Sequence, residues 1–207
     1  MKKFDFAKGF PVPQGFDAQK QALYDQDPEY RAKVDAVEKA RKERAEALQV
    51  AAGPILADLH DVGVDVSSLW DLVARTDPYP AALPILMHHL ERGGYPDRVE
   101  EALGRSLAVK PAIQFWDRLR ELYRAPRNRG EETGVALALA ASATVRQLDD
   151  LESFVADTKR GDNRVFFVRP VLRLGGDRGR EAIAALVDDP VVGKEARALL
   201  NRRRKSK

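Results

Sequence analysis

Residues 174–200 read LGGDRGREAIAALVDDPVVGKEARALL, and this stretch decides the fold. Glycine and proline divide it into two segments, each rich in alanine, leucine and charged residues that favour helix. We therefore predict one helix over 179–187 and a second over 191–203, with an inter-helix turn at 175–179. Neither segment shows the alternation of apolar and polar residues that predicts a strand.

Short helical segments separated by glycine and proline continue back to residue 67. The first predicted helix begins at Ser67 or Ser68 and ends near 75. Six further helices are predicted over 80–91, 96–109, 111–124, 131–143, 144–158 and 165–174. Asp27-Pro28-Glu29 has the features of a helix start, and a long amphipathic helix is predicted over 28–60, with Gly53-Pro54 as a point where it can kink. Only residues 165–168 compete as a strand, so the fold class is all-α.

Apolar positions recur along the second half of the chain. With a shift of 32 residues, Ile113, Trp116 and Leu119 fall on Val145, Leu148 and Leu151; with a shift of 67, Trp116 and Leu119 fall on Ile183 and Leu186. This spacing predicts helical hairpins of 32 to 35 residues, which must stack to bury their apolar faces. The residues expected in that core are Trp116, Leu119, Leu148, Leu151, Ile183 and Leu186.

Three segments resemble the HEAT-repeat pattern. Residues 174–190 have a Leu-Gly turn and then a helix that ends in leucine and acids, and residues 191–200 and 97–103 resemble the first helix of a unit. The resemblance spans roughly residues 67–200, but the units are shorter than the about 40–47 residues of HEAT units, and the arginine that often follows the valine is absent after Val192. The resemblance implies a right-handed α-α solenoid of HEAT-like hairpins, a binding scaffold in most such proteins and an enzyme in a few.

The N-terminal residues 1–27 differ in composition from the rest of the chain. Glycine and proline break any periodicity, which predicts an extended arm. The arm carries four aromatic side chains: Phe4, Phe6, Phe10 and Phe16. Because disordered tails are poor in aromatic residues, we expect these rings to bind a groove on this protein's own helices, a partner, or a second copy, in that order.

Basic residues are concentrated in the second half. Residues 1–97 hold 12 basic and 16 acidic residues, a net charge of −4, and residues 98–207 hold 23 and 16, a net charge of +7. The densest cluster, near Trp116 and Tyr123, is Arg118, Arg120, Arg124, Arg127 and Arg129. These arginines are candidate partner contacts for protein or nucleic acid. The favoured interpretation is a solvated surface with ion pairs, because acids are interleaved with the arginines.

Motifs for catalysis, metals and cofactors find little support in the sequence. The chain has no cysteine, and the adjacent His88 and His89 diverge on a helix, so they are poorly placed to share a metal ion. Neighbouring acids at 100–101, 131–132, 149–150 and 188–189 diverge likewise and suit helix ends. The glycine-rich 175–179 lacks the lysine of a phosphate-binding loop, and no Gly-x-Ser-x-Gly is present. We predict no catalytic residue, cofactor or metal.

These observations lead to one expected organisation and function. The predicted parts are an arm over 1–27, a long helix over 28–62, a HEAT-like domain over 63–203 and a basic tail over 204–207. We expect a cytoplasmic, non-catalytic protein-binding module (an adaptor, scaffold or neutralising partner) with no membrane segment. The alternatives are a nucleic-acid-binding HEAT-like protein that uses the basic half, and an enzyme on a HEAT-like scaffold.

Overall fold

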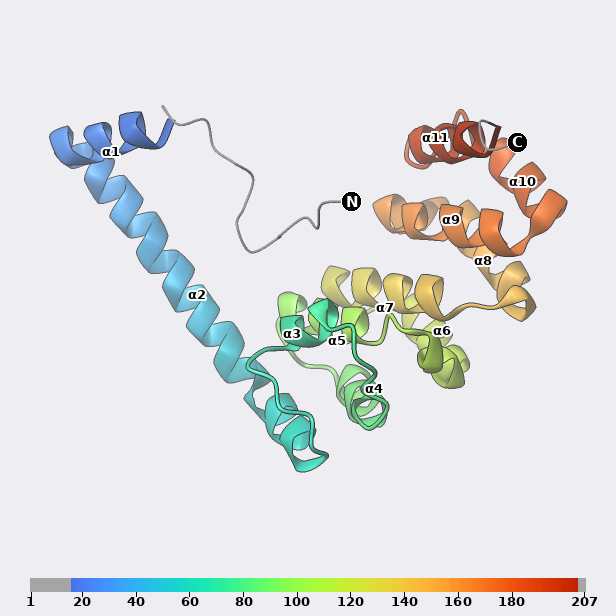
Figure 1. The fold of residues 1–207 in the computed structure, drawn as a ribbon, viewed down its shortest axis with the longest axis horizontal. Coiled ribbons are helices and arrows are strands. Elements are labelled where there is room, and N and C mark those ends of the chain that lie inside the picture. Colours follow the sequence, from blue (N-terminus) through green and yellow to red (C-terminus); the bar gives the residue numbers. More distant parts are fainter. Residues whose placement is uncertain (1–15, 205–207) are drawn as a thin grey trace. The chain divides into compact units, whose positions relative to one another are not determined.

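The computed structural model describes residues 16–204, with side chains over 18–201. Within these residues the secondary structure is helical and contains no strand, so the all-α prediction is confirmed (Figure 1). None of the helices in this part of the chain is both long and apolar enough to cross a membrane. The chain divides into two compact units, Met1–Ala47 and Leu48–Lys207.

The first unit contains α1 (Phe16–Gln26) and the beginning of α2 (Pro28–Asp61). Asp27 joins them, and its carboxylate accepts hydrogen bonds from the backbone N–H groups of Glu29 and Tyr30 at 2.9 and 3.0 Å. The extended conformation predicted for residues 16–26 is wrong, because the sequence after Gly15 is free of glycine and proline and favours helix. Phe4, Phe6 and Phe10, and the side chain of Phe16, lie outside the described residues.

Helix α2 confirms the long helix predicted over 28–60. It begins at Pro28, runs through Pro54 and ends at Asp61. Its last part belongs to the second unit and buries Ala52, Ile55 and Leu59.

The second unit continues with nine further α-helices, connected by short turns and 3-10 helices. The α-helices are α3 (Leu69–Ala74), α4 (Ala82–Arg92), α5 (Asp97–Ser106), α6 (Trp116–Arg124), α7 (Arg129–Ser142), α8 (Leu148–Ala156), α9 (Val165–Leu174), α10 (Gly176–Ala184) and α11 (Gly193–Arg204). A helix overlaps each predicted segment, and residues 165–168 lie in α9 rather than in a strand. The turn predicted at 175–179 is wrong, because α10 already begins at Gly176 and ends at Ala184. The local signals act as expected at Ser68, whose hydroxyl caps α3, and at Gly93, which ends α4 with a positive φ.

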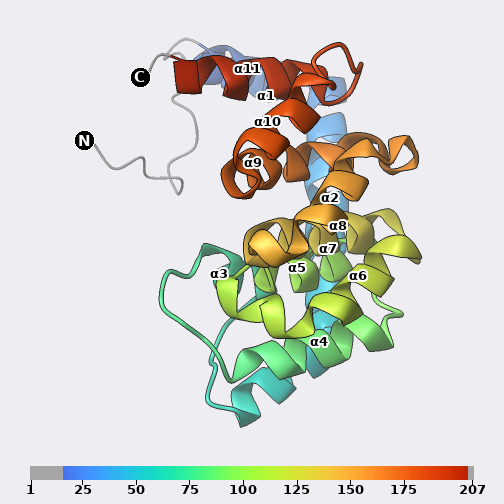
Figure 2. The same ribbon diagram turned by 90° about the vertical axis from the view of Figure 1, so that its right-hand side faces the viewer.

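Helices α3 to α11 form two layers. The odd-numbered helices make one layer, in which α3 contacts α5, α5 contacts α7, α7 contacts α9 and α9 contacts α11. The even-numbered helices pack against them: α4 on α5, α6 on α7, α8 on α9, and α10 on α9 and α11 (Figures 1 and 2). We call these the odd-helix layer and the even-helix layer. Between α5 and α7 the backbones approach closely at Gly104, where an added Cβ would lie 2.3 Å from a backbone carbon of Gly134.

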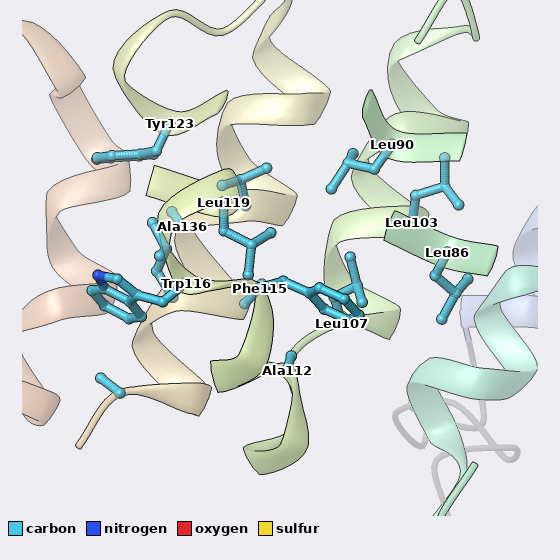
Figure 3. Packing of buried hydrophobic residues seen from close by; sticks show 14 of the residues in the cluster. Leu86, Leu90, Leu103, Leu107, Ala112, Phe115, Trp116, Leu119, Tyr123 and Ala136 are labelled. Atoms are coloured by element: carbon cyan, nitrogen blue, oxygen red, sulfur yellow. The ribbon is translucent and has the colours of Figure 1, made fainter. Parts of the chain in front are cut away.

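The core lies between the two layers and contains most of the positions that the repeat register predicts. Trp116, Leu119, Leu148, Leu151 and Ile183 are buried, which confirms five of the six predictions. Figure 3 shows Trp116 and Leu119 among other residues of this core. Leu186 is only half-buried, because α10 ends at Ala184 and leaves it in the following turn. Trp116 is thus a core residue, and its indole N–H donates to Asp150 at 2.9 Å.

Candidate binding groove

The five arginines predicted as partner contacts all pair with carboxylates of this chain. The pairs are Arg118 with Glu91, Arg120 with Asp117 and Asp150, Arg124 with Glu121 and Asp150, Arg127 with Glu131, and Arg129 with Asp162. The hydrogen bond from Arg118 lowers the pKa of the Glu91 carboxyl, so both groups stay charged at neutral pH. The cluster therefore carries little uncompensated charge with which to attract an anion.

Arg127 illustrates the structural role of this cluster. Its guanidinium bonds the fully buried Glu131 and donates to the backbone carbonyls of Leu90 and Glu91, with the second bond at 2.8 Å. The bonded Glu131 raises the pKa of the Arg127 guanidinium. Arg127 therefore joins the end of α4 to the start of α7 and serves a structural role, although part of its side chain is exposed.

The two adjacent histidines have different surroundings. His88 is exposed, whereas His89 is buried and bonded through Nδ1 to the Tyr95 hydroxyl at 2.6 Å and through Nε2 to Asp58 at 2.8 Å. Since a carboxylate only accepts, Nε2 carries a proton and donates to Asp58. Among the described residues no group of three or more His, Asp or Glu side chains is arranged to hold a metal ion.

The neighbouring acids serve structural roles rather than sharing a site. Glu100 and Glu131 are buried near the starts of α5 and α7, where Glu100 accepts a bond from the Tyr95 N–H at 3.2 Å. Asp189 accepts from the buried Arg164 at 2.7 Å and from two backbone N–H groups before α11. The bond from Arg164 lowers the pKa of Asp189 to about 2.

A surface pocket of about 440 Å³ opens beside the predicted contact residue Arg129. It lies between the loop before α7 and the 3-10 segment Thr158–Arg164. Two of its three cations are already paired, Arg129 with Asp162 at 3.5 Å and Arg160 with Glu132 at 3.6 Å, whereas Lys159 forms no ion pair with a carboxylate of the described residues. Beyond Lys159, this pocket therefore offers little free charge to a ligand.

A second depression, of about 560 Å³, crosses the odd-helix layer, and we call it the odd-face groove. It is lined by Ala108, Leu137, Ala140, Ala141, Val165, Phe166, Arg169, Pro170, Arg173 and Glu195. These residues come from α7, α9, α11 and the turn after α5. Seven of the ten are apolar, and three of those seven are alanines. The floor of the groove is therefore apolar and lined in part by small side chains.

The odd-face groove also carries positive charge without a counter-ion. Arg169 and Arg173 are exposed, lie one turn apart on α9 and form no ion pair with any carboxylate of the described residues. Glu195 lies at the other side of the groove and is not paired with them. Lys110 lies nearby, donates to the Ala143 carbonyl at 3.3 Å, and has its pKa lowered by burial and by the charge of Arg173.

The sequence interpretation missed this groove. Its lining is assembled from residues 108 to 195, so no local motif marks it. The one local signal is the spacing of Arg169 and Arg173 on an otherwise apolar helix. Comparisons with protein-family models, curated proteins and solved structures found no match to this chain.

Proposed function

We propose that this chain is a non-catalytic protein-binding module, built as a short α-α solenoid of HEAT-like hairpins, whose partner binds the odd-helix layer. The contacts between successive odd-numbered helices, with even-numbered helices packed behind them, support the repeat architecture. In such an architecture one layer offers a continuous surface to a partner.

The observation that carries the proposal is the odd-face groove. It combines an apolar floor with exposed polar groups at its edge, as protein interfaces do. The arginine cluster that favoured nucleic acid is paired internally, which weakens that alternative. Nothing in the groove resembles a nucleophile with an adjacent base.

The test is an affinity purification from cells of the source organism with the full chain as bait. Ala141→Trp places a bulky ring on the groove floor, and Ala184→Trp places the same ring at an exposed position of α10, in the even-helix layer. Arg169→Glu is a second groove variant should the tryptophan disturb folding. Bound proteins are quantified by mass spectrometry after nuclease treatment, and circular dichroism checks that each bait is folded.

We expect a protein retained by the native chain and by Ala184→Trp, and depleted with the folded groove variants. Equal recovery with all baits would contradict binding through the odd-helix layer. Recovery of nucleic acid alone, lost after nuclease treatment, would favour the nucleic-acid alternative instead.

A further inference from the structure

We propose that the odd-face groove binds an acidic, amphipathic peptide segment of the partner protein, with its carboxylates on Arg169 and Arg173 and its apolar side chains on the floor. The inference rests on the proposed function and specifies the partner's chemistry. It is argued from the charge and the shape of the groove.

The first argument is that Arg169 and Arg173 line the groove without an ion pair, although Glu195 belongs to the same lining. Twelve arginines of the described residues pair with a carboxylate of this chain. Arg169 and Arg173 are two of the eight that form no such pair, and they lie one turn apart on the same helix, facing one groove. Two guanidinium groups at this spacing can each donate a two-pronged hydrogen bond to a carboxylate of one peptide.

The second argument is the repulsion between like charges at this place. Burial lowers the pKa of Lys110, and the charge of Arg173 lowers it further, as expected for two cations that lie close together. A bound carboxylate would relieve this repulsion, so the free protein favours an anionic ligand here.

The third argument concerns the apolar floor. Ala108, Ala140 and Ala141 have small side chains that allow a partner's backbone to approach, and Phe166 and Leu137 offer apolar area beside them. A nucleic acid would need a track of cations for its phosphates, whereas the groove has two arginines, one glutamate and otherwise apolar side chains. A peptide with both acids and apolar residues fits this combination better.

The charge also disfavours residues 1–15, the first part of the N-terminal arm, as the occupant. They carry Lys2, Lys3 and Lys8 against the single acid Asp5. This positively charged segment gains nothing from Arg169 and Arg173, so a separate acidic partner is favoured.

The experiment is a selection of random dodecapeptides displayed on phage against the full chain, followed by affinity measurements on enriched peptides by fluorescence polarisation. The groove variant is Arg169→Glu with Arg173→Glu. The matched control is Arg146→Glu with Arg180→Glu, which makes the same charge change at arginines outside the groove that also form no ion pair with a carboxylate of the described residues. Both variants are compared with the native chain by thermal unfolding.

We expect enriched peptides to combine acids with apolar residues. The groove variant should bind them at least about tenfold more weakly, because it loses charge-assisted hydrogen bonds, and the control variant should bind them as the native chain does. Peptides in which the acids are replaced by lysine should regain affinity for the groove variant, which a merely misfolded protein would not show.

Four results would overturn the inference. They are enriched peptides without an excess of acids, equal loss of affinity in both variants, displacement of the acidic peptides by a synthetic peptide of residues 1–15, and tighter binding of oligonucleotides that depends on the two arginines. A dimer by light scattering that the groove variant dissociates would assign the groove to a second copy. In each of these cases, loss of a bound protein from the Ala141→Trp bait would still support the proposed function. Failure of this inference can therefore be told apart from failure of the proposed function.

Discussion

The buried ion pair between Arg164 and Asp189 is expected to be one of the largest single electrostatic contributions to stability. Arg164 is 2% exposed and donates to Asp189 through two nitrogens at 2.7 and 3.2 Å, while its Nε donates to the Val155 carbonyl at 2.8 Å. Asp189→Asn removes the negative charge but keeps a side-chain oxygen for the backbone N–H groups before α11. The guanidinium is then buried without a counter-charge.

The expected loss of unfolding free energy is about 3 kcal/mol at neutral pH, the lower end of what breaking a buried pair costs, because the amide oxygen still accepts hydrogen bonds. Urea unfolding followed by circular dichroism measures it. Asp149→Asn is the matched control, since Asp149 is 84% exposed in its pair with Arg178, and it should cost less than about 1 kcal/mol. Adding Arg164→Met to Asp189→Asn should recover part of the loss, because no unpaired charge stays buried.

The same pair predicts a pH dependence. The pKa of Asp189 is about 2 in the folded protein and has its ordinary value of 3.8 in the unfolded chain. The folded state therefore gains stability from the ionised group above pH 3.8 and loses it as the pH falls toward 2. The difference between the native chain and Asp189→Asn should narrow over this interval. A cost below about 1 kcal/mol, or a difference independent of pH, would refute the reasoning.

Three further predictions concern packing and the groove. Gly104→Ala should destabilise the protein by about 1–3 kcal/mol, because its Cβ would meet the backbone of α7, whereas helix propensity alone would make the change stabilising; thermal unfolding decides the sign. Leu151→Ala should cost about 2–5 kcal/mol in urea unfolding, and a value under about 1 kcal/mol would contradict its place in the core. Arg173→Ala should leave stability unchanged within about 0.5 kcal/mol and raise the pKa of Lys110, followed by NMR titration; an unmoved pKa would show that the two cations do not interact.

Helix positions were predictable because their signals are local. Proline and glycine end helices through backbone geometry, and Ser68 and Asn128 cap helices with a bond to a residue two or three positions on. The buried positions from Trp116 to Ile183 were predictable because apolar spacing reports which face of a helix is covered. The extended conformation predicted for residues 16–26 was wrong because glycine and proline within residues 1–27 occur only up to Gly15, and their effect was extended to the helix-favouring residues of α1 that follow.

The site depended on contacts that sequence spacing does not encode. Interleaved acids did predict the local pairs of Arg120, Arg124 and Arg127, but Arg118 meets Glu91, 27 residues away. Arg169 and Arg173 stay unpaired because packing brings no carboxylate within reach of them. Helix periodicity and turn residues act over a few positions along the chain, so the sequence alone determined where the helices lie. Which charges are neutralised, and where a groove remains open, depends on residues that only the packing of α5, α7, α9 and α11 brings together.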